Sequence, residues 1–168
     1  MADTKVAETR VLDELRKSEF LRGIPDEQLT KLAAICRPVE FPARSTVFEQ
    51  YGLAKNVYVI VSGEISLAIC DPEESCRQIG VVHGGDLMGW SPLVGRMRLY
   101  DTARCVTAVR ALEFEGSKLM DFCAANSPFG FEFMRRVACV LAERLSGARL
   151  QLLEISGMFL PEFPVESD

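Results

Sequence analysis

Residues 57–70 read VYVIVSGEISLAIC, two apolar runs separated by Ser62, Gly63 and Glu64. Runs rich in valine and isoleucine and bounded by turn residues are typical of β-strands. The stretch therefore predicts a strand, a tight turn and a second strand. Further short segments of this kind are VEF, TVFEQ, CRQIGVV, TARCVTA and VRALEFE. About eight short strands with turns marked by glycine and proline predict a sandwich or jelly-roll barrel.

Ahead of these strands, apolar residues recur at helical spacing rather than in alternation. The pattern predicts one helix over residues 7–20 and a second over residues 24–36, which Pro38 brings to an end. We therefore expect an N-terminal helical segment over residues 1–36 and a β jelly-roll over residues 37–116. The expected fold is mainly β with flanking α-helices: an eight-stranded jelly-roll, or double-stranded β-helix, with N-terminal helices and a long C-terminal helix.

Helical spacing returns over residues 117–156. Ser117 is the predicted N-cap of a short helix, and Pro128 begins a long helix that runs to about Glu154. Apolar residues of the long helix fall at steps of three and four, as in the seam between paired helices. This stripe either covers the chain's own barrel or pairs residues 131–154 with a second copy. It consists of Met134, Val137, Leu141, Leu145, Ala148, Leu152 and Ile155.

The composition fits one globular domain, because 168 residues with 48% hydrophobic content can bury one substantial core. The formal net charge of −5 argues against non-specific binding to nucleic acid or anionic lipid, since both require a basic surface. No apolar run is long enough to span a membrane, and the N-terminus lacks a secretory signal, so we expect a cytoplasmic protein. The tail, residues 157–168, either stays mobile or docks through its apolar residues.

The residues that usually carry metal or covalent chemistry are sparse. Six cysteines occur without a C-x-x-C pair or the spacing of a zinc or iron–sulfur site, so we expect most of them to be buried. Cys70 and Cys76 flank the turn DPEES, where a disulfide could form on oxidation. His83 is the single histidine, which is too few for the metal site of a jelly-roll enzyme, although it could ligate a haem.

Two further motifs carry a family resemblance. GGDLMGW, residues 84–90, and TARCVTAVRALEFEGSKL, residues 102–119, follow VYVIVSGEISL in the order helices, strands, loop, strands, long helix. In this respect the chain resembles the cyclic-nucleotide-binding domain of catabolite-activator-type regulators and of cyclic-AMP-dependent kinase regulatory subunits, over residues 11–155. The resemblance implies a ligand cassette, here about residues 84–103. In it, N–H groups at a helix start and an arginine hold the cyclic phosphate, and a glutamate binds the ribose 2′-hydroxyl.

The resemblance places uncharged residues at both charged positions of the cassette. Trp90, after Gly89, occupies the position of the glutamate, and Leu99 that of the arginine, while Thr102 matches a ligand-contacting hydroxyl. A buried anion without its counter-charge would cost on the order of several kcal/mol. The lost sugar contact would cost about 1 kcal/mol or more. Pro92 also lacks an N–H group that the cradle could use.

Arg96 and Arg98 leave an alternative open. Either could swing in and replace the missing arginine, or both could be solvated loop charges; strict alternation would turn Arg98 away from the side of Leu99. Trp90 could close the pocket as an apolar plug or stack on a planar ligand. The candidate ligand-binding residues of the cassette are Gly85, Gly89, Trp90, Ser91, Leu93, Arg96, Arg98, Leu99 and Thr102.

The sequence therefore predicts a non-enzymatic regulatory or sensor module that requires no cofactor and is not a standard cyclic AMP binder. The alternative is a cyclic-nucleotide-binding signalling protein that uses Arg96 or Arg98 for the phosphate. A cupin-like enzyme ranks last. The expected partner is a second copy, through residues 131–154; another protein is the further option. Direct DNA binding is not expected, because only SGMFLPEFPVESD follows Ile155 and leaves no room for a recognition helix.

Overall fold

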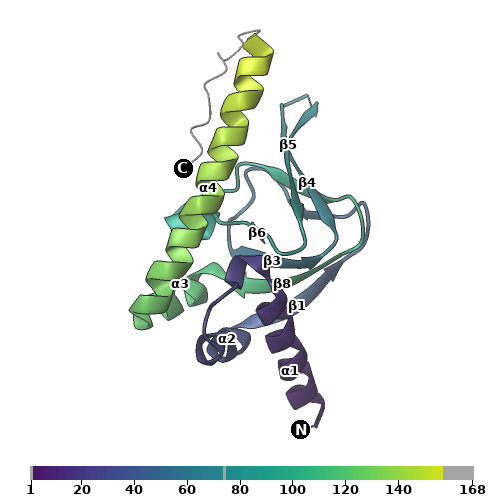
Figure 1. The fold of residues 1–168 in the computed structure, drawn as a ribbon. Coiled ribbons are helices and arrows are strands. Elements are labelled where there is room, and N and C mark those ends of the chain that lie inside the picture. Colours follow the sequence, from purple (N-terminus) through teal and green to yellow (C-terminus); the bar gives the residue numbers. More distant parts are fainter. Residues whose placement is uncertain (1, 74, 157–168) are drawn as a thin grey trace, which may run out of the picture.

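The computed structural model describes residues 2–73 and 75–156. Two four-stranded antiparallel sheets form a roll, with strand orders β1-β8-β3-β6 and β2-β7-β4-β5. Helices flank the roll at both ends of the chain (Figure 1), so the fold is mainly β with flanking helices, as the sequence predicts. The strands are β1 (Cys36–Phe41), β2 (Thr46–Phe48), β3 (Asn56–Ser62), β4 (Glu64–Cys70), β5 (Cys76–His83), β6 (Leu87–Met88), β7 (Thr102–Cys105) and β8 (Val109–Glu115). The helices are α1 (Ala2–Lys17), η1 (Glu19–Leu21), α2 (Asp26–Ala33), η2 (Ser91–Val94), α3 (Gly116–Ala125) and α4 (Ser127–Ser156), where η marks a 3₁₀ helix.

The strand–turn–strand stretch connects the two sheets. β3 lies in one sheet and β4 in the other, and they are joined at Gly63, whose φ of 98° is in the left-handed region. A Cβ here would lie 2.4 Å from the carbonyl oxygen of Ala108, so the turn requires glycine. At the far end of β4, Cys70 pairs in register with Cys76 of β5, and their sulfurs are bonded. The disulfide that the sequence allows is therefore formed in this structure.

Alternation along β3 builds two cores, one on each face of its sheet. Val57 and Val59 pack in the core beneath the helices, whereas Tyr58 and Ile60 pack in the interior of the roll. β8 repeats this pattern, because it pairs with β3 along most of its length. Glu113 therefore occupies an inward position of β8 and lies at the end of the roll interior.

Two predicted helix boundaries are wrong. α2 ends at Ala33 and β1 begins at Cys36, so Pro38 lies inside a strand rather than at the end of a helix. The sheet tolerates this proline because β1 is an edge strand, which within the described residues pairs with β8 alone. Ser117 is not the N-cap of α3, since the cap position belongs to Glu115 and the Ser117 hydroxyl donates to the Glu115 carboxylate at 2.9 Å.

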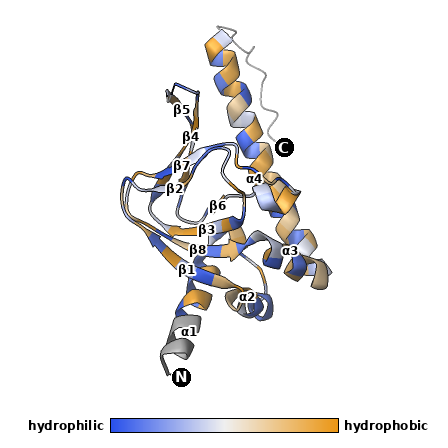
Figure 2. Cartoon of the chain, turned by 180° about the vertical axis from the view of Figure 1, so that it is seen from behind, coloured by the Kyte–Doolittle hydropathy of each residue, from blue (hydrophilic) through white to orange (hydrophobic). Residues whose placement is uncertain are grey.

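The two halves of α4 have different environments. The first half packs on the helical core through Phe133 and Val137, and it is held by Arg136, which donates to the carbonyls of Phe20 and Arg22 at 2.7 Å. Beyond Arg144 the same apolar stripe is exposed, and Figure 2 shows apolar residues continuing to the upper end of this helix. The exposed fractions are 53% for Leu145, 66% for Leu152 and 65% for Ile155. None of the helices in the described part of the chain is long and apolar enough to cross a membrane.

Candidate functional site

The predicted cassette forms one continuous segment between two strands of the roll. β6 leads into η2, a single 3₁₀ turn that ends at the left-handed Gly95, and a loop over residues 96–101 leads into β7. Gly89 has a φ of 73°, and a Cβ there would lie 2.8 Å from the carbonyl oxygen of Asn56. The close approach of this turn to β3 therefore requires glycine. Trp90 holds the N-cap position of η2, but its side chain makes no capping hydrogen bond.

The inner side of the loop is closed by packing and by backbone hydrogen bonds. Leu99 is only 5% exposed, and it pairs with the loop before β3. Its N–H donates to the Gly52 carbonyl at 3.0 Å, and its carbonyl accepts from Tyr51 N–H at 2.8 Å. Thr102 is buried, and its hydroxyl accepts a hydrogen bond from the Gln50 N–H at 3.0 Å. The structure therefore buries both Leu99 and Thr102, and we call this buried part of the cassette its inner side.

Arg96 and Arg98 are both held on the outer side of the same loop. The Arg96 guanidinium donates to the Tyr100 hydroxyl at 2.8 Å and lies 5.5 Å from the centre of its ring. Arg98 donates to the Tyr51 carbonyl at 3.0 Å and pairs across a β-bridge with Leu53. Both arginines are exposed, whereas the neighbouring Leu99 is buried.

The remaining candidate residues belong to the packing of the turn. Ser91 and Leu93 are buried, and Leu93 lies in the core beneath the helices. Trp90 is half-buried and packs against this same core. Gly85 is left-handed, with a φ of 99°, and its N–H donates to the Ile60 carbonyl at 2.7 Å.

α4 contacts the cassette through a charged group that the sequence reading missed. The Arg144 guanidinium donates to the Leu87 carbonyl at 2.9 Å and faces the carboxylates of Asp101 and Asp86. Burial lowers the pKa of Arg144, and burial likewise raises the pKa of Asp101, although Arg144 opposes this second shift. Arg144 lies three residues after Leu141, beside the apolar stripe of the helix. A charged residue next to an otherwise apolar stripe is the sequence feature that could have predicted this contact.

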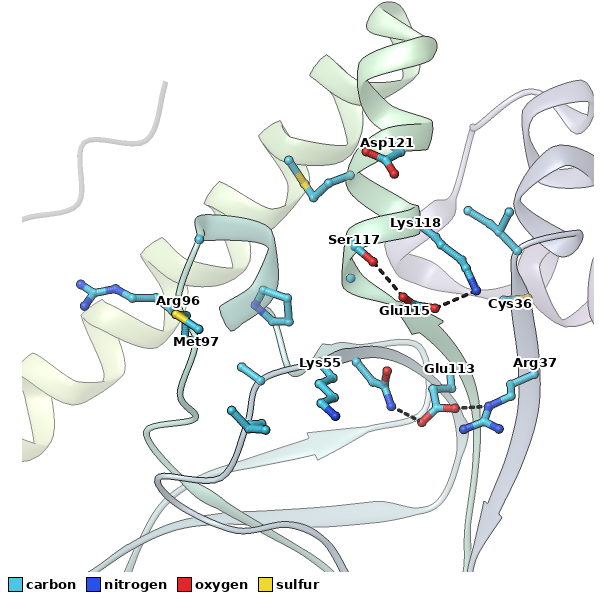
Figure 3. Close-up of a pocket in the computed structure, with 18 of the residues that line it drawn as sticks. Cys36, Arg37, Lys55, Arg96, Met97, Glu113, Glu115, Ser117, Lys118 and Asp121 are labelled. Atoms are coloured by element: carbon cyan, nitrogen blue, oxygen red, sulfur yellow. Dashed lines mark hydrogen bonds and ion pairs between the residues drawn. The ribbon is translucent and has the colours of Figure 1, made fainter.

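A separate cavity lies at the end of the roll. Its walls do not include Leu99 or Thr102 of the cassette. Its volume is about 1380 Å³, and β1, β8, α3 and the cassette contribute to its walls. Figure 3 shows Glu113 at its base, where this buried carboxylate forms an ion pair with Arg37. The same carboxylate accepts hydrogen bonds from Asn56 at 2.7 Å and from Tyr58 at 3.1 Å. Burial raises the pKa of Tyr58 to about 12.

The charges around this cavity are largely matched in pairs within the protein. Lys118 and Ser117 both contact Glu115, at 2.7 Å and 2.9 Å. Lys55 extends into the cavity, and Arg96 points away from it (Figure 3). Glu113 was also missed from the sequence, although a charged residue at an inward position of VRALEFE is the pattern that marks it. His83 is exposed at the end of β5, and no group of metal-ligating side chains is found in residues 2–73 and 75–156.

Comparison with known proteins identifies the fold. Residues 38–126, just over half of the chain, match the family model of the cyclic nucleotide-binding domain. The chain belongs to the cyclic nucleotide-binding domain family. The resemblance read from the sequence is thereby confirmed, as is the jelly-roll fold class.

Proteins similar to this chain include regulators. A CRP-like cAMP-activated global transcriptional regulator of Mycobacterium tuberculosis is 24% identical over 147 residues, which cover 84% of this chain and 61% of that protein. The chain therefore spans less than two thirds of that relative. A putative cyclic nucleotide-binding protein from Geobacter metallireducens has a TM-score of 0.68 and 26% identity, covering 79% of this chain and 96% of that one. The regulatory subunit of a cAMP-independent protein kinase A from Trypanosoma cruzi, bound to guanosine, has a TM-score of 0.71 and 15% identity, covering 94% and 53%.

Proposed function

We propose that this chain is a regulatory, non-catalytic domain whose cassette does not hold cyclic AMP through the charged contacts of its family. The observation that carries the proposal is the placement of Leu99. Its side chain is buried on the inner side of the cassette, at the position where the resemblance requires the phosphate-binding arginine. An anion placed there would lose its hydration without gaining a counter-charge.

The outer arginines do not easily replace the missing one. Turning Arg98 inward would break its hydrogen bond to the Tyr51 carbonyl and shift the register of the loop by one residue. Such a shift would also break the backbone pairing of Leu99 with Gly52 and Tyr51. Arg96 would have to leave both the hydroxyl and the ring of Tyr100.

Calorimetric titration of the full chain with cyclic AMP and cyclic GMP tests the proposal. We expect no binding in the micromolar range. Guanosine belongs in the same titration, because a nucleoside without phosphate suits an uncharged pocket and the trypanosome relative is bound to guanosine. Micromolar binding of a cyclic nucleotide that is abolished by Arg96→Ala or Arg98→Ala would instead establish the alternative function.

A gain-of-function variant sharpens this test. Trp90→Glu combined with Leu99→Arg supplies both family charges, and we expect it to bind cyclic AMP where the natural chain does not. The matched control is Trp90→Glu combined with Arg98→Lys, which adds the same acid but leaves Leu99 in place. Circular dichroism shows whether each variant is folded before binding is compared.

We further propose that the chain forms a homodimer through the second half of α4. The exposed stripe beyond Arg144 continues the face that is buried in the first half, and exposed apolar stripes of this kind are costly in water. We expect Leu152→Glu to convert a dimer to a monomer in light scattering. Leu150→Glu is the matched control, because Leu150 is 54% exposed but lies two residues away, on the opposite side of the helix. A natural chain that is monomeric at high concentration would contradict the dimer.

A further inference from the structure

The tip of the β4–β5 hairpin carries a disulfide that solvent can reach. Cys70 ends β4, Cys76 begins β5, and their Cα atoms lie 4.0 Å apart in register. Cys76 is exposed and Cys70 is half-buried. An external thiolate can therefore approach the sulfur of Cys76, which is the geometric requirement for exchange.

The shape of the turn does not depend on this bond. The Asp71 N–H donates to the Ser75 carbonyl at 3.0 Å. The Asp71 carboxylate in turn accepts hydrogen bonds from the N–H groups of Glu73 and Ser75, at 3.0 Å and 2.9 Å. Since these contacts hold the turn, the bond can open while the two cysteines stay close enough to close it again.

The other cysteines are less suited to exchange. Burial raises the pKa of Cys36 to about 12 and that of Cys123 to about 11, so both remain thiols, and Cys105 is buried. Cys139 on α4 is exposed and is the one further thiol of the described residues that a reagent in solution reaches readily. It therefore serves as an internal control.

Hydrogen bonds connect the hairpin tip to the cassette. The Cys70 N–H donates to the Gln50 side-chain carbonyl at 2.8 Å, and the Gln50 N–H donates to the Thr102 hydroxyl at 3.0 Å. Thr102 is also the register partner of Ala68, two residues before Cys70 on β4. A change in the position of Cys70 thus acts on the first residue of β7, directly after the cassette loop.

We propose that Cys70 and Cys76 form a reversible thiol–disulfide exchange site whose state is transmitted to the cassette through Gln50 and Thr102. The reactant is a dithiol, either a small molecule or a protein. One thiolate of the dithiol attacks a sulfur of the pair and forms a mixed disulfide, and its second thiolate then releases the reduced hairpin. Two electrons and two protons pass to Cys70 and Cys76, and the dithiol leaves as a disulfide. In a reducing compartment, disulfides that occur are usually transient and regulatory, as this proposal requires.

The main experiment compares the oxidised and reduced states of the full natural chain. Its result therefore does not depend on whether a variant folds. The protein is equilibrated in mixtures of reduced and oxidised dithiothreitol, free thiols are trapped by alkylation, and peptide mass spectrometry assigns Cys70 and Cys76. Amide hydrogen exchange over residues 98–104 and the fluorescence of Trp90, the single tryptophan, report on the cassette. We expect reduction to raise exchange over 98–104 and to shift Trp90 emission with the same midpoint as the alkylation.

Three variants separate the site from its transmission. Cys70→Ser combined with Cys76→Ser should show the reduced behaviour under all conditions, and Cys139→Ser should behave like the natural chain. Gln50→Ala should still exchange thiols but lose the response over 98–104. The proposal is wrong if no Cys70–Cys76 bond forms on oxidation, if it forms without any change over 98–104, or if reduction exposes amides throughout the roll. This test is independent of whether the cassette binds a nucleotide.

Discussion

The inner, buried side chains of the cassette loop, residues 96–101, and of Thr102, which begins β7, differ completely in chemistry from the outer, exposed side chains of the loop. Inside lie Leu99 and Thr102, which are buried; outside lie Arg96, Arg98 and the half-exposed ring of Tyr100. At the β-bridge between Arg98 and Leu53, consecutive side chains turn to opposite sides, so Arg98 is exposed while Leu99 is buried. A guanidinium at position 98 is therefore on the wrong side for a ligand that an arginine at position 99 would bind.

Under the proposed function, anion binding by such a cassette depends on register as well as on composition. The loop contains two arginines, which is enough positive charge to bind a phosphate. The backbone pairing of Leu99 with Gly52 and Tyr51 fixes which side chains turn inward. The inner side chains are buried, whereas the outer arginines are exposed and form hydrogen bonds at the surface.

Replacing Leu99 should have the largest effect on stability, because it is the apolar residue that closes the inner side. We expect Leu99→Ala to lower the free energy of unfolding by about 2–5 kcal/mol, through lost transfer energy and the cavity left behind. Urea denaturation of the purified chain measures this change. Arg98→Ala on the outer side should stay within about 0.5 kcal/mol of the natural chain. Equal costs for the two variants would show that the loop has no inner side in solution.

Much of this arrangement could be predicted from the sequence, because it follows from periodicity. The turn at Gly63 and seven of the eight strands follow from glycine chemistry and from short apolar runs bounded by turn residues, whereas β6 lies within the segment that the resemblance assigns to the cassette. The outward position of Arg98 follows from alternation. The long helix was equally clear, since its apolar stripe repeats over several turns.

What could not be predicted depends on contacts between segments that are distant in the chain. Arg144 reaches the Leu87 carbonyl only because α4 folds back across β6. Glu113 is tolerated inside the roll because Arg37 and Asn56 arrive from two other strands. The sequence alone predicts that Pro38 ends a helix. Its place on an edge strand could not be predicted, because that place is a property of the whole sheet.

The hydroxyl of Thr102 gives an intermediate effect. Thr102→Val keeps the shape of the side chain but removes the acceptor for the half-buried Gln50 N–H, so we expect a loss of about 1–3 kcal/mol in the free energy of unfolding. Thr102→Ser retains the oxygen and should recover most of that loss. Thermal or urea unfolding distinguishes the two variants. If valine were as stable as threonine, this contact would not contribute to the inner side.

The smallest effect concerns Asp101, the one acidic residue of the loop, which is half-buried against Arg144. Burial raises the pKa of this carboxyl above its ordinary value of 3.8, with Arg144 opposing the shift. A folded chain with a raised pKa takes up its proton before the unfolded chain does. The stability that Asp101 contributes is therefore fully present below the ordinary value, and it is lost as the pH rises through the raised one. Relative to Asp101→Asn, the natural chain should thus become more stable as the pH falls from neutrality toward 3.8.

Asp26 provides a control with the opposite sign. The hydrogen bond from Arg16 lowers the pKa of Asp26, so its contribution is present at neutral pH and is lost as the pH falls through the lowered value. Relative to Asp26→Asn, the natural chain should become less stable over the same acidic range. Urea denaturation of the three proteins across this range measures both slopes. Slopes of the same sign would mean that the attraction of Arg144 outweighs burial at Asp101, and a flat slope for Asp101 would mean that its carboxyl is hydrated; either result would contradict its burial beside the loop.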